Sequence, residues 1–179
     1  MSLTFSEATL VPTLKALENL RSIMQIGAAH AKAQQLNESE LLAERLFADM
    51  FDLKMQVMAT MLLAVHQGVL RIVDASPSPI QPEVNDFDDI DAMIATLIAD
   101  VAGIDHDQFD AAQDQPVVCA LPIGEAQFTN AAEFMLQWTL PHLYFHVATA
   151  YDILRHRGVK LAKKDYLGGV PMTFVEQPA

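Results

Sequence analysis

Two histidines in the second half of the chain have the spacing of a metal-binding pair. His142 and His146 are four residues apart in an apolar segment, and on a helix this spacing places both imidazoles on one face. Imidazole nitrogen is a common ligand of zinc and similar ions, but a catalytic site usually has three protein ligands and one open position. The pair alone therefore predicts an incomplete metal site.

A third ligand would have to come from another helix. His66 is the leading candidate, because it flanks the apolar stripe of the helix expected over residues 49–73. Asp49, Gln56 and His30 are weaker candidates. The alternative is that the histidines are surface or core side chains with ordinary hydrogen-bond partners, and the sequence leaves both interpretations open.

The segment that carries the pair predicts one long helix, from Thr129 or Asn130 to Gly158. Threonine and asparagine are favoured N-caps, and glycine is favoured just past a helix end. Apolar residues cover most of its circumference, which is typical of the most buried helix of a bundle. Pro141 has no backbone N–H and predicts a kink in the middle of this helix, beside His142.

Three further long helices are expected to complete the bundle. The helical spacing of apolar residues predicts them over residues 6–34, 49–73 and 86–103, with a short helical segment over residues 39–46. Three prolines within residues 74–82 predict an extended connection across the end of the bundle. Residues 116–121 and 127–129, on either side of a turn, predict a small β-hairpin.

The second of these helices is expected to bury one apolar stripe. Its members recur at helical spacing and are Phe51, Met55, Met58, Leu62, Val65, Val69 and Val73. Gln56 and Thr60 are expected to lie towards the other, polar side of the helix.

The composition indicates a single domain over residues 1–179, with residues 158–179 as a C-terminal tail. Of the 179 residues, 51% are hydrophobic, which favours a globular chain, and the formal net charge is −12. Such a charge repels phosphate backbones and anionic lipid headgroups, so nucleic-acid and peripheral-membrane partners are not expected. The longest apolar runs carry Gln, His or Asp, so we expect no membrane span.

The single cysteine and the first residues of the chain indicate a cytoplasmic setting. Cys119 alone excludes an internal disulfide and a cysteine-rich metal site, and its place in a β-type run favours a small buried side chain. The N-terminal residues lack the basic and apolar regions of a signal peptide. Exposed apolar helix surface would favour a homodimer.

Several segments resemble an uncharacterised bacterial family of DinB/YfiT-like proteins. They are residues 43–53 with Gln56 and Val57, residues 140–159, and residues 164–168. The resemblance implies an all-α four-helix bundle in up-down-down-up order, which agrees with the proline-rich crossover. It also implies, for the wider superfamily, a divalent ion held by one histidine of the second helix and an HxxxH pair of the fourth.

The chain departs from that superfamily pattern on the second helix. His142 and His146 match the pair, but Asp49, Asp52 and Gln56 stand near the start of the second helix, where the other histidine is expected. His66 lies further along. Characterised superfamily members include thiol-dependent transferases and isomerases.

Two hypotheses of function follow from the sequence. The first is a small-molecule pocket near His142 and His146 in an enzyme that depends on one divalent metal, zinc or nickel. The second is a non-catalytic binding or structural homodimer with a degenerate metal site. The sequence identifies neither the small molecule nor the reaction.

Overall fold

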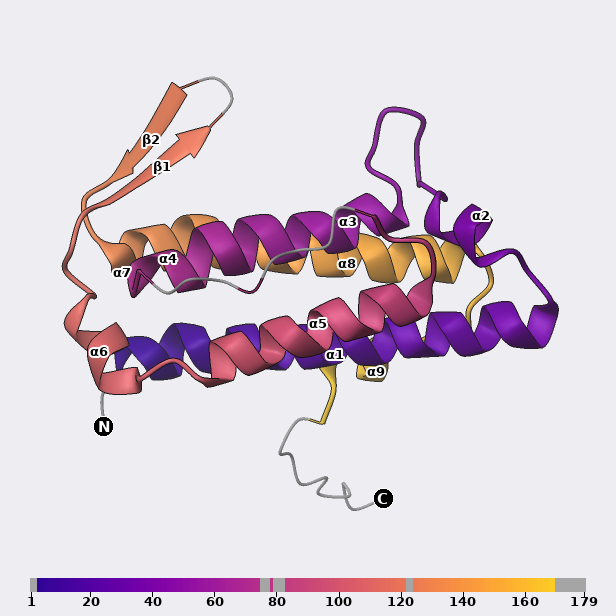
Figure 1. The fold of residues 1–179 in the computed structure, drawn as a ribbon, viewed down its shortest axis with the longest axis horizontal. Coiled ribbons are helices and arrows are strands. Elements are labelled where there is room, and N and C mark those ends of the chain that lie inside the picture. Colours follow the sequence, from indigo (N-terminus) through magenta and orange to yellow (C-terminus); the bar gives the residue numbers. More distant parts are fainter. Residues whose placement is uncertain (1–2, 75–77, 79–82, 122–123, 170–179) are drawn as a thin grey trace, which may run out of the picture.

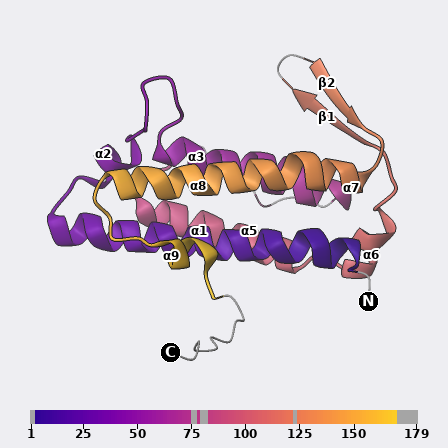
Figure 2. The ribbon, with the colours of Figure 1, turned by 180° about the vertical axis from the view of Figure 1, so that it is seen from behind.

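Four long helical stretches lie side by side in the computed structural model, which describes residues 3–74, 78, 83–121 and 124–169 (Figures 1 and 2). Their bounds are α1 (Phe5–Gln34); α3 (Leu53–Ala59), η1 (Thr60–Val69) and α4 (Leu70–Ile72) in succession; α5 (Phe87–Ala102); and α7 (Ala131–Phe134), η2 (Met135–Thr139) and α8 (Leu140–His156) in succession. The first and fourth stretches run one way and the second and third run the other way. The predicted all-α bundle in up-down-down-up order is confirmed.

Side-chain caps begin the four stretches. Asp52, Asp86 and Asn130 accept hydrogen bonds from backbone N–H groups at the starts of α3, α5 and α7, as short polar side chains do at helix N-termini. Thr4 caps α1 in a reciprocal capping box with Glu7. The ends of the predicted helices are therefore correct to within a few residues.

Ser6, at the start of the first helix, makes a long-range contact instead of a cap. Its N–H and hydroxyl both bond the carboxylate of Asp110, the former at 2.6 Å. Asp110 lies in α6 (His106–Ala111), a short helix that the sequence did not predict. The start of α1 is thereby attached to α6.

The second helical stretch buries Val65 and Val69 as predicted, but its first half is rotated from the predicted orientation. Gln56 is 2% exposed and Thr60 is fully buried, whereas Met55 and Leu62 are 40% and 43% exposed. The stretch begins only after Asp52, and η1 is a ten-residue π-helix. Because a π-helix has more residues per turn than an α-helix, a stripe drawn at α-helical spacing drifts around the helix.

By length and composition alone, Leu53–Ile72 is apolar enough to cross a membrane, which the sequence analysis did not expect. Over half of the apolar window is buried inside the bundle. The stretch packs against α8 and α5, so its apolar surface forms part of the core.

The predicted hairpin pairs β1 (Val117–Leu121) with β2 (Gly124–Phe128) in antiparallel register, Val117 opposite Phe128. The hairpin projects from one end of the bundle (Figure 1), and Arg71 Nη1 donates to the Val118 carbonyl at 2.6 Å. Cys119 is a free, buried thiol, as predicted.

The predicted crossover and tail lie partly outside the described residues. Of residues 74–82 only Asp74 and Ser78 are described, and Ser78 N–H and Oγ donate to Asp100 of α5. The tail is described to Gly169 and includes α9 (Lys163–Leu167). One more short helix, α2 (Glu38–Leu42), follows α1.

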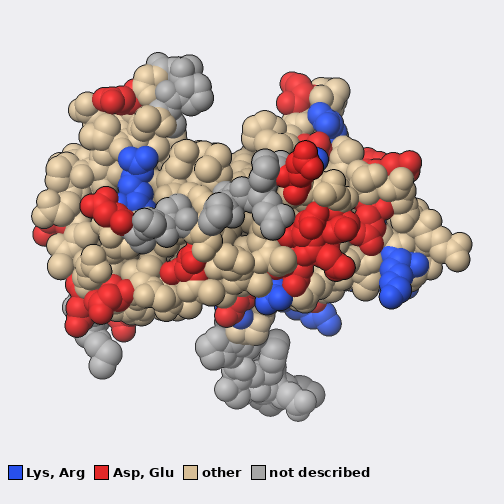
Figure 3. All heavy atoms as spheres, viewed as in Figure 1, with Lys and Arg blue, Asp and Glu red and all other residues tan. Residues whose placement is uncertain are grey.

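Acidic side chains gather over the start of α5 (Figure 3). Asp88 and Asp89 lie in its first turn, where the helix dipole favours negative charge. Asp91 forms a bidentate ion pair with Arg21 of α1 at 2.7 and 2.8 Å. These negative charges therefore stabilise the start of α5 and its packing on α1.

Pro141 is accommodated where the fourth helical stretch changes type. It is the second residue of α8, which continues η2 without a break, so the proline lies inside one continuous helical stretch. Just before it, the Leu140 N–H donates to the Met135 carbonyl five residues back. The proline, predicted as a kink in a helix interior, thus follows a π-helical turn.

The two π-helical segments pack against each other at a glycine. A Cβ added to Gly68 in η1 would stand 2.6 Å from Thr139 Cγ2 in η2 and 3.2 Å from the Leu63 carbonyl oxygen. This position therefore permits a backbone approach that a larger residue would prevent.

We predict that Gly68→Ala lowers the free energy of unfolding by about 1–3 kcal/mol, because the added methyl group overlaps Thr139. The measurement is equilibrium urea unfolding. Combining it with Thr139→Ser, which removes Cγ2, should recover part of the loss. Gly169→Ala is the control, because a Cβ there meets nothing within 4 Å. Full stability of the Gly68→Ala protein would contradict the packing described here.

Candidate functional site

The predicted histidine pair lies on one face of α8. The ring centroids of His142 and His146 are 6.3 Å apart, and the rings are inclined by 31°. His146 is buried, with 6% of its surface exposed, and His142 is half-buried. The sequence therefore placed the two imidazoles together correctly.

Gln56 of α3 fixes the proton of His146. Its Oε1 lies 2.7 Å from His146 Nδ1, and its own Nε2 donates to the Phe51 carbonyl at 3.2 Å. That second bond sets the orientation of the amide, so the oxygen must face the imidazole. His146 Nδ1 consequently carries the proton, and Nε2 keeps a lone pair.

His142 is held in the same way by its own helix. Its Nδ1 lies 2.8 Å from the Trp138 carbonyl oxygen, and a carbonyl can only accept, so Nδ1 is the donor. The Trp138 ring centroid lies 4.4 Å from the imidazole centroid. In the neutral form of each imidazole, Nε2 is therefore the accepting atom.

Two phenyl rings flank His146. Phe51 stacks with it at a centroid distance of 6.4 Å, and Phe145 meets it edge-on at 5.2 Å. The two phenylalanines are 50% and 58% exposed. Together with His142 and Trp138 they form what we call the aromatic site.

Burial makes His146 a weak base. Burial, and secondarily the proximity of His142, lower the pKa of His146 to about 4. Its imidazole is therefore neutral near pH 7 and offers an acceptor, not a positive charge.

His66 belongs to a different part of the bundle. Burial lowers its pKa, against an opposing effect of Asp100 on α5. Its Nε2 is buried and has no hydrogen-bond partner among the described residues. Among the described residues, His66 does not join His142 and His146 in a group of three side chains that could hold a metal ion.

The other candidate ligands are separated or already used. Asp52 caps α3 and pairs with Arg45 at 3.3 Å, Asp49 is exposed, and His30 is half-buried on α1. Gln56 touches His146 on the Nδ1 side, away from the free Nε2.

The residues present do not fit a three-ligand metal centre. Within the described parts of the chain, no group of three or more His, Cys, Asp or Glu side chains is placed to hold a metal ion. Two imidazoles whose Nδ1–H groups are anchored on oxygens resemble ligands with their outer hydrogen bonds in place. The third ligand of a catalytic site is missing from this set.

The chain is similar to a protein family and to a solved structure. A family profile described as "Domain of unknown function (DUF1993)" matches residues 5–167. The chain belongs to the DUF1993 family. A DinB family member protein from Shewanella denitrificans, known from a crystal structure, is 30% identical to this chain, with a TM-score of 0.80 over 96% of this chain and 95% of that one. No curated protein matches the chain.

These comparisons confirm the resemblance predicted from the sequence. This DUF1993 protein has a DinB-like fold, and its family is one of unknown function. They name no reaction, ligand or metal.

Gln56 is the site residue that sequence reasoning ranked too low. A polar residue four positions after the capping Asp52 lies on the same face of the helix, and Asp52 itself has only 15% of its side chain exposed. The four-residue spacing between Asp52 and Gln56 was the feature of the sequence that could have identified Gln56. The partner ninety residues away, His146, could not be read from local pattern.

We predict that stability falls at mildly acid pH through His146. The unfolded chain binds a proton near pH 6.5 and the folded chain only near pH 4, so unfolding becomes easier as pH falls between these values. Between pH 7 and pH 5 the loss should be up to about 2 kcal/mol.

Urea unfolding of the wild type and of His146→Leu at pH 7 and pH 5 measures this loss in the free energy of unfolding. The variant should lack it, whereas the exposed His156→Gln, as the control, should retain it. An identical pH dependence in all three proteins would contradict the assignment.

Proposed function

We propose that this DUF1993 protein is a non-catalytic binding protein and that the aromatic site takes a small apolar molecule. The molecule would donate one hydrogen bond to His146 Nε2 and lay an aromatic or aliphatic body against Phe51 and Phe145. The proposal develops the second hypothesis from the sequence, a binding protein with a degenerate metal site.

One observation carries the proposal, the hydrogen bond from His146 Nδ1 to Gln56 Oε1 at 2.7 Å. It commits His146 to one tautomer, so that the free nitrogen accepts and cannot donate. A ligand with an O–H, N–H or S–H donor meets this requirement. A ligand with only acceptors does not.

The surroundings of His146 support the same ligand chemistry. Phe51 and Phe145 are among the large apolar side chains with half or more of their surface exposed, and exposed apolar clusters mark binding surfaces more often than chance. The neutral imidazole adds no charge to the site. A neutral apolar donor is therefore favoured over an ion.

The metal-dependent enzyme of the first hypothesis stays a prediction of the resemblance. His142 and His146 are its two matching residues, and the described side chains offer no third ligand of the usual kinds. The proposal for this chain therefore involves no metal.

We expect phenol, which has one ring and one donor, to bind the wild-type protein saturably. Anisole, which has the ring without the donor, should bind at least about tenfold more weakly, because a lost hydrogen bond in a dry site costs about 1–2 kcal/mol. The measurement is the shift of the His146 ring resonances in NMR titrations.

Two variants test whether phenol binds at the aromatic site. His146→Leu should reduce phenol affinity about tenfold, by the same lost bond, and His66→Leu should leave it unchanged. Equal affinity for phenol and anisole, or an unaffected His146→Leu variant, would refute the proposal.

Metal analysis tests the competing enzyme hypothesis directly. We expect protein purified without a nickel column, then incubated with zinc and dialysed, to retain far less than one metal per chain. His146→Ala should give the same value. Stoichiometric metal that disappears in His146→Ala would favour the metal-dependent enzyme.

We also propose, as the alternative occupant of the aromatic site, a second copy of the chain. The exposed Phe145 ring supports this, since a homodimer interface would cover it. Light scattering should then give twice the chain mass of 19.7 kDa. Phe145→Asp should return the mass to that of one chain, and a wild-type mass of one chain would exclude the homodimer.

A further inference from the structure

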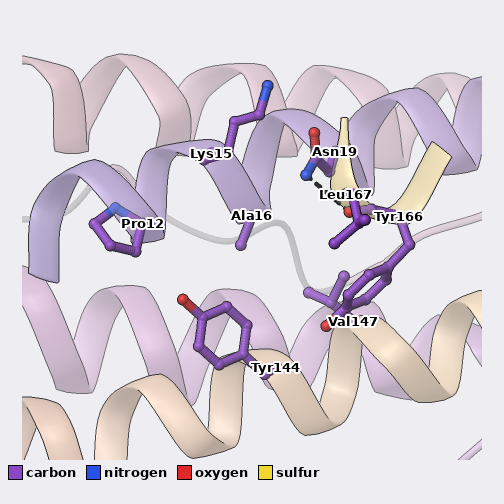
Figure 4. Close-up of a pocket in the computed structure, with 8 residues that line it drawn as sticks. All are labelled: Pro12, Lys15, Ala16, Asn19, Tyr144, Val147, Tyr166 and Leu167. Atoms are coloured by element: carbon purple, nitrogen blue, oxygen red, sulfur yellow. Dashed lines mark hydrogen bonds between the residues drawn. The ribbon is translucent and has the colours of Figure 1, made fainter. Parts of the chain in front are cut away.

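A small hollow lies between α1, α8 and α9, on a different face of α8 from the histidine pair (Figure 4). Its volume is about 220 Å³. Tyr144 and Val147, which line it, are turned well away from His142 and His146, given 100° of rotation per residue. The hollow is therefore separate from the aromatic site.

The walls of the hollow are mainly apolar. Pro12 and Ala16 contribute from α1, Val147 from α8 and Leu167 from α9. About seven water molecules would fill the space at roughly 30 Å³ each, so its capacity matches a ligand of about eight non-hydrogen atoms. An apolar body of that size would displace poorly bound water.

The third wall, α9, is fixed in place. Asn19 Nδ2 of α1 donates to the Tyr166 carbonyl at 2.8 Å, and the Ala162 N–H donates to Asp165 at the start of α9. Gly168 has φ of +63°, and a Cβ there would overlap the Asn19 amide. The close approach of the chain after α9 to α1 thus requires glycine, and the hollow exists before any ligand arrives.

The free donors of the lining are the two tyrosine hydroxyls and the Lys15 ammonium group, and Asn19 Oδ1 is an acceptor. Tyr144 and Tyr166 enter the hollow from α8 and α9 (Figure 4). Burial raises the pKa of both phenols, with further contributions from Tyr144 and Asp152 at Tyr166, so each keeps its O–H. The Asn19 amide nitrogen is already engaged with Tyr166. A ligand head with acceptor atoms suits this set.

Lys15 is the one charged side chain in the lining, which contains no carboxylate. It forms no ion pair or hydrogen bond with the described residues. In Figure 4 its stem rises from α1 and its ammonium group points away from Tyr144, but the flexible four-carbon stem lets the group turn to the mouth of the hollow. This cation stands out in a chain of net charge −12.

We propose that this hollow binds a small carboxylate with an apolar body, such as a short-chain aliphatic acid. The apolar walls take the hydrocarbon, and the Lys15 ammonium and the Tyr144 hydroxyl hold the carboxylate. The inference is independent of the proposed function, because none of its residues belongs to the aromatic site.

The test uses hexanoate, which has eight non-hydrogen atoms, with hexan-1-ol and hexylamine of the same length. Two-dimensional NMR on the full chain should show saturable shifts around Tyr144 and Tyr166 with hexanoate, with a Kd on the order of millimolar. Hexan-1-ol should bind at least about tenfold more weakly, and hexylamine more weakly still, because the charge-assisted bond is lost.

Lys15→Met should weaken hexanoate binding about tenfold and leave hexan-1-ol unchanged. Lys32→Met is the matched control, with the same change of charge on the same helix, and should bind hexanoate as the wild type does. Leu167→Trp, at an exposed position over the mouth, should block both ligands. His146→Leu should have no effect, which separates this site from the aromatic site.

Absence of saturable shifts with hexanoate would overturn the site. Equal binding of hexan-1-ol, or an unaffected Lys15→Met variant, would overturn the carboxylate as its ligand.

Discussion

The hydrogen bond between Gln56 and His146 is the contact on which the arrangement of the candidate site depends. It joins the second helical stretch to the fourth in a buried position, and its amide is fixed in turn by the Phe51 carbonyl. A buried polar group without a partner would cost about 1–3 kcal/mol, so each of the two side chains requires the other. The pair consequently sets the helix rotation, the tautomer and the position of Phe51 together.

The two π-helical segments affect which side chains of the second helical stretch face the core. Gly68 lets η1 approach η2 at Thr139, and the wider turns change which residues face the core. Gln56, at the beginning of the same stretch, can then lie against α8 while Met55 and Leu62 face outward. A regular α-helix of the same sequence would present a different stripe to the core.

The bundle was predictable from the sequence because its signals are local. Apolar spacing, the caps Asp86 and Asn130 and the terminal glycine at residue 158 are each encoded within a few residues of the element they define. The His142 and His146 pair was found for the same reason. The buried stripe of the second stretch was predicted correctly at Val65 and Val69 but wrongly at Met55 and Leu62, since π-helical spacing has no recognised local signature. The Gln56 contact and the packing of α6 and α9 depend on partners far along the chain.

The contacts of α1 with later segments have a consequence for how the chain acquires its structure during synthesis. Ser6 bonds Asp110, and Asn19 bonds Tyr166, across 104 and 147 residues. Chains emerge from the ribosome at about 5–20 residues per second, so the polar partners of the first helix are absent for several seconds after it has been made. During that interval its apolar face is exposed to other chains and to chaperones, so α1, made before the other helices of this bundle, is among the last of them to be fully enclosed.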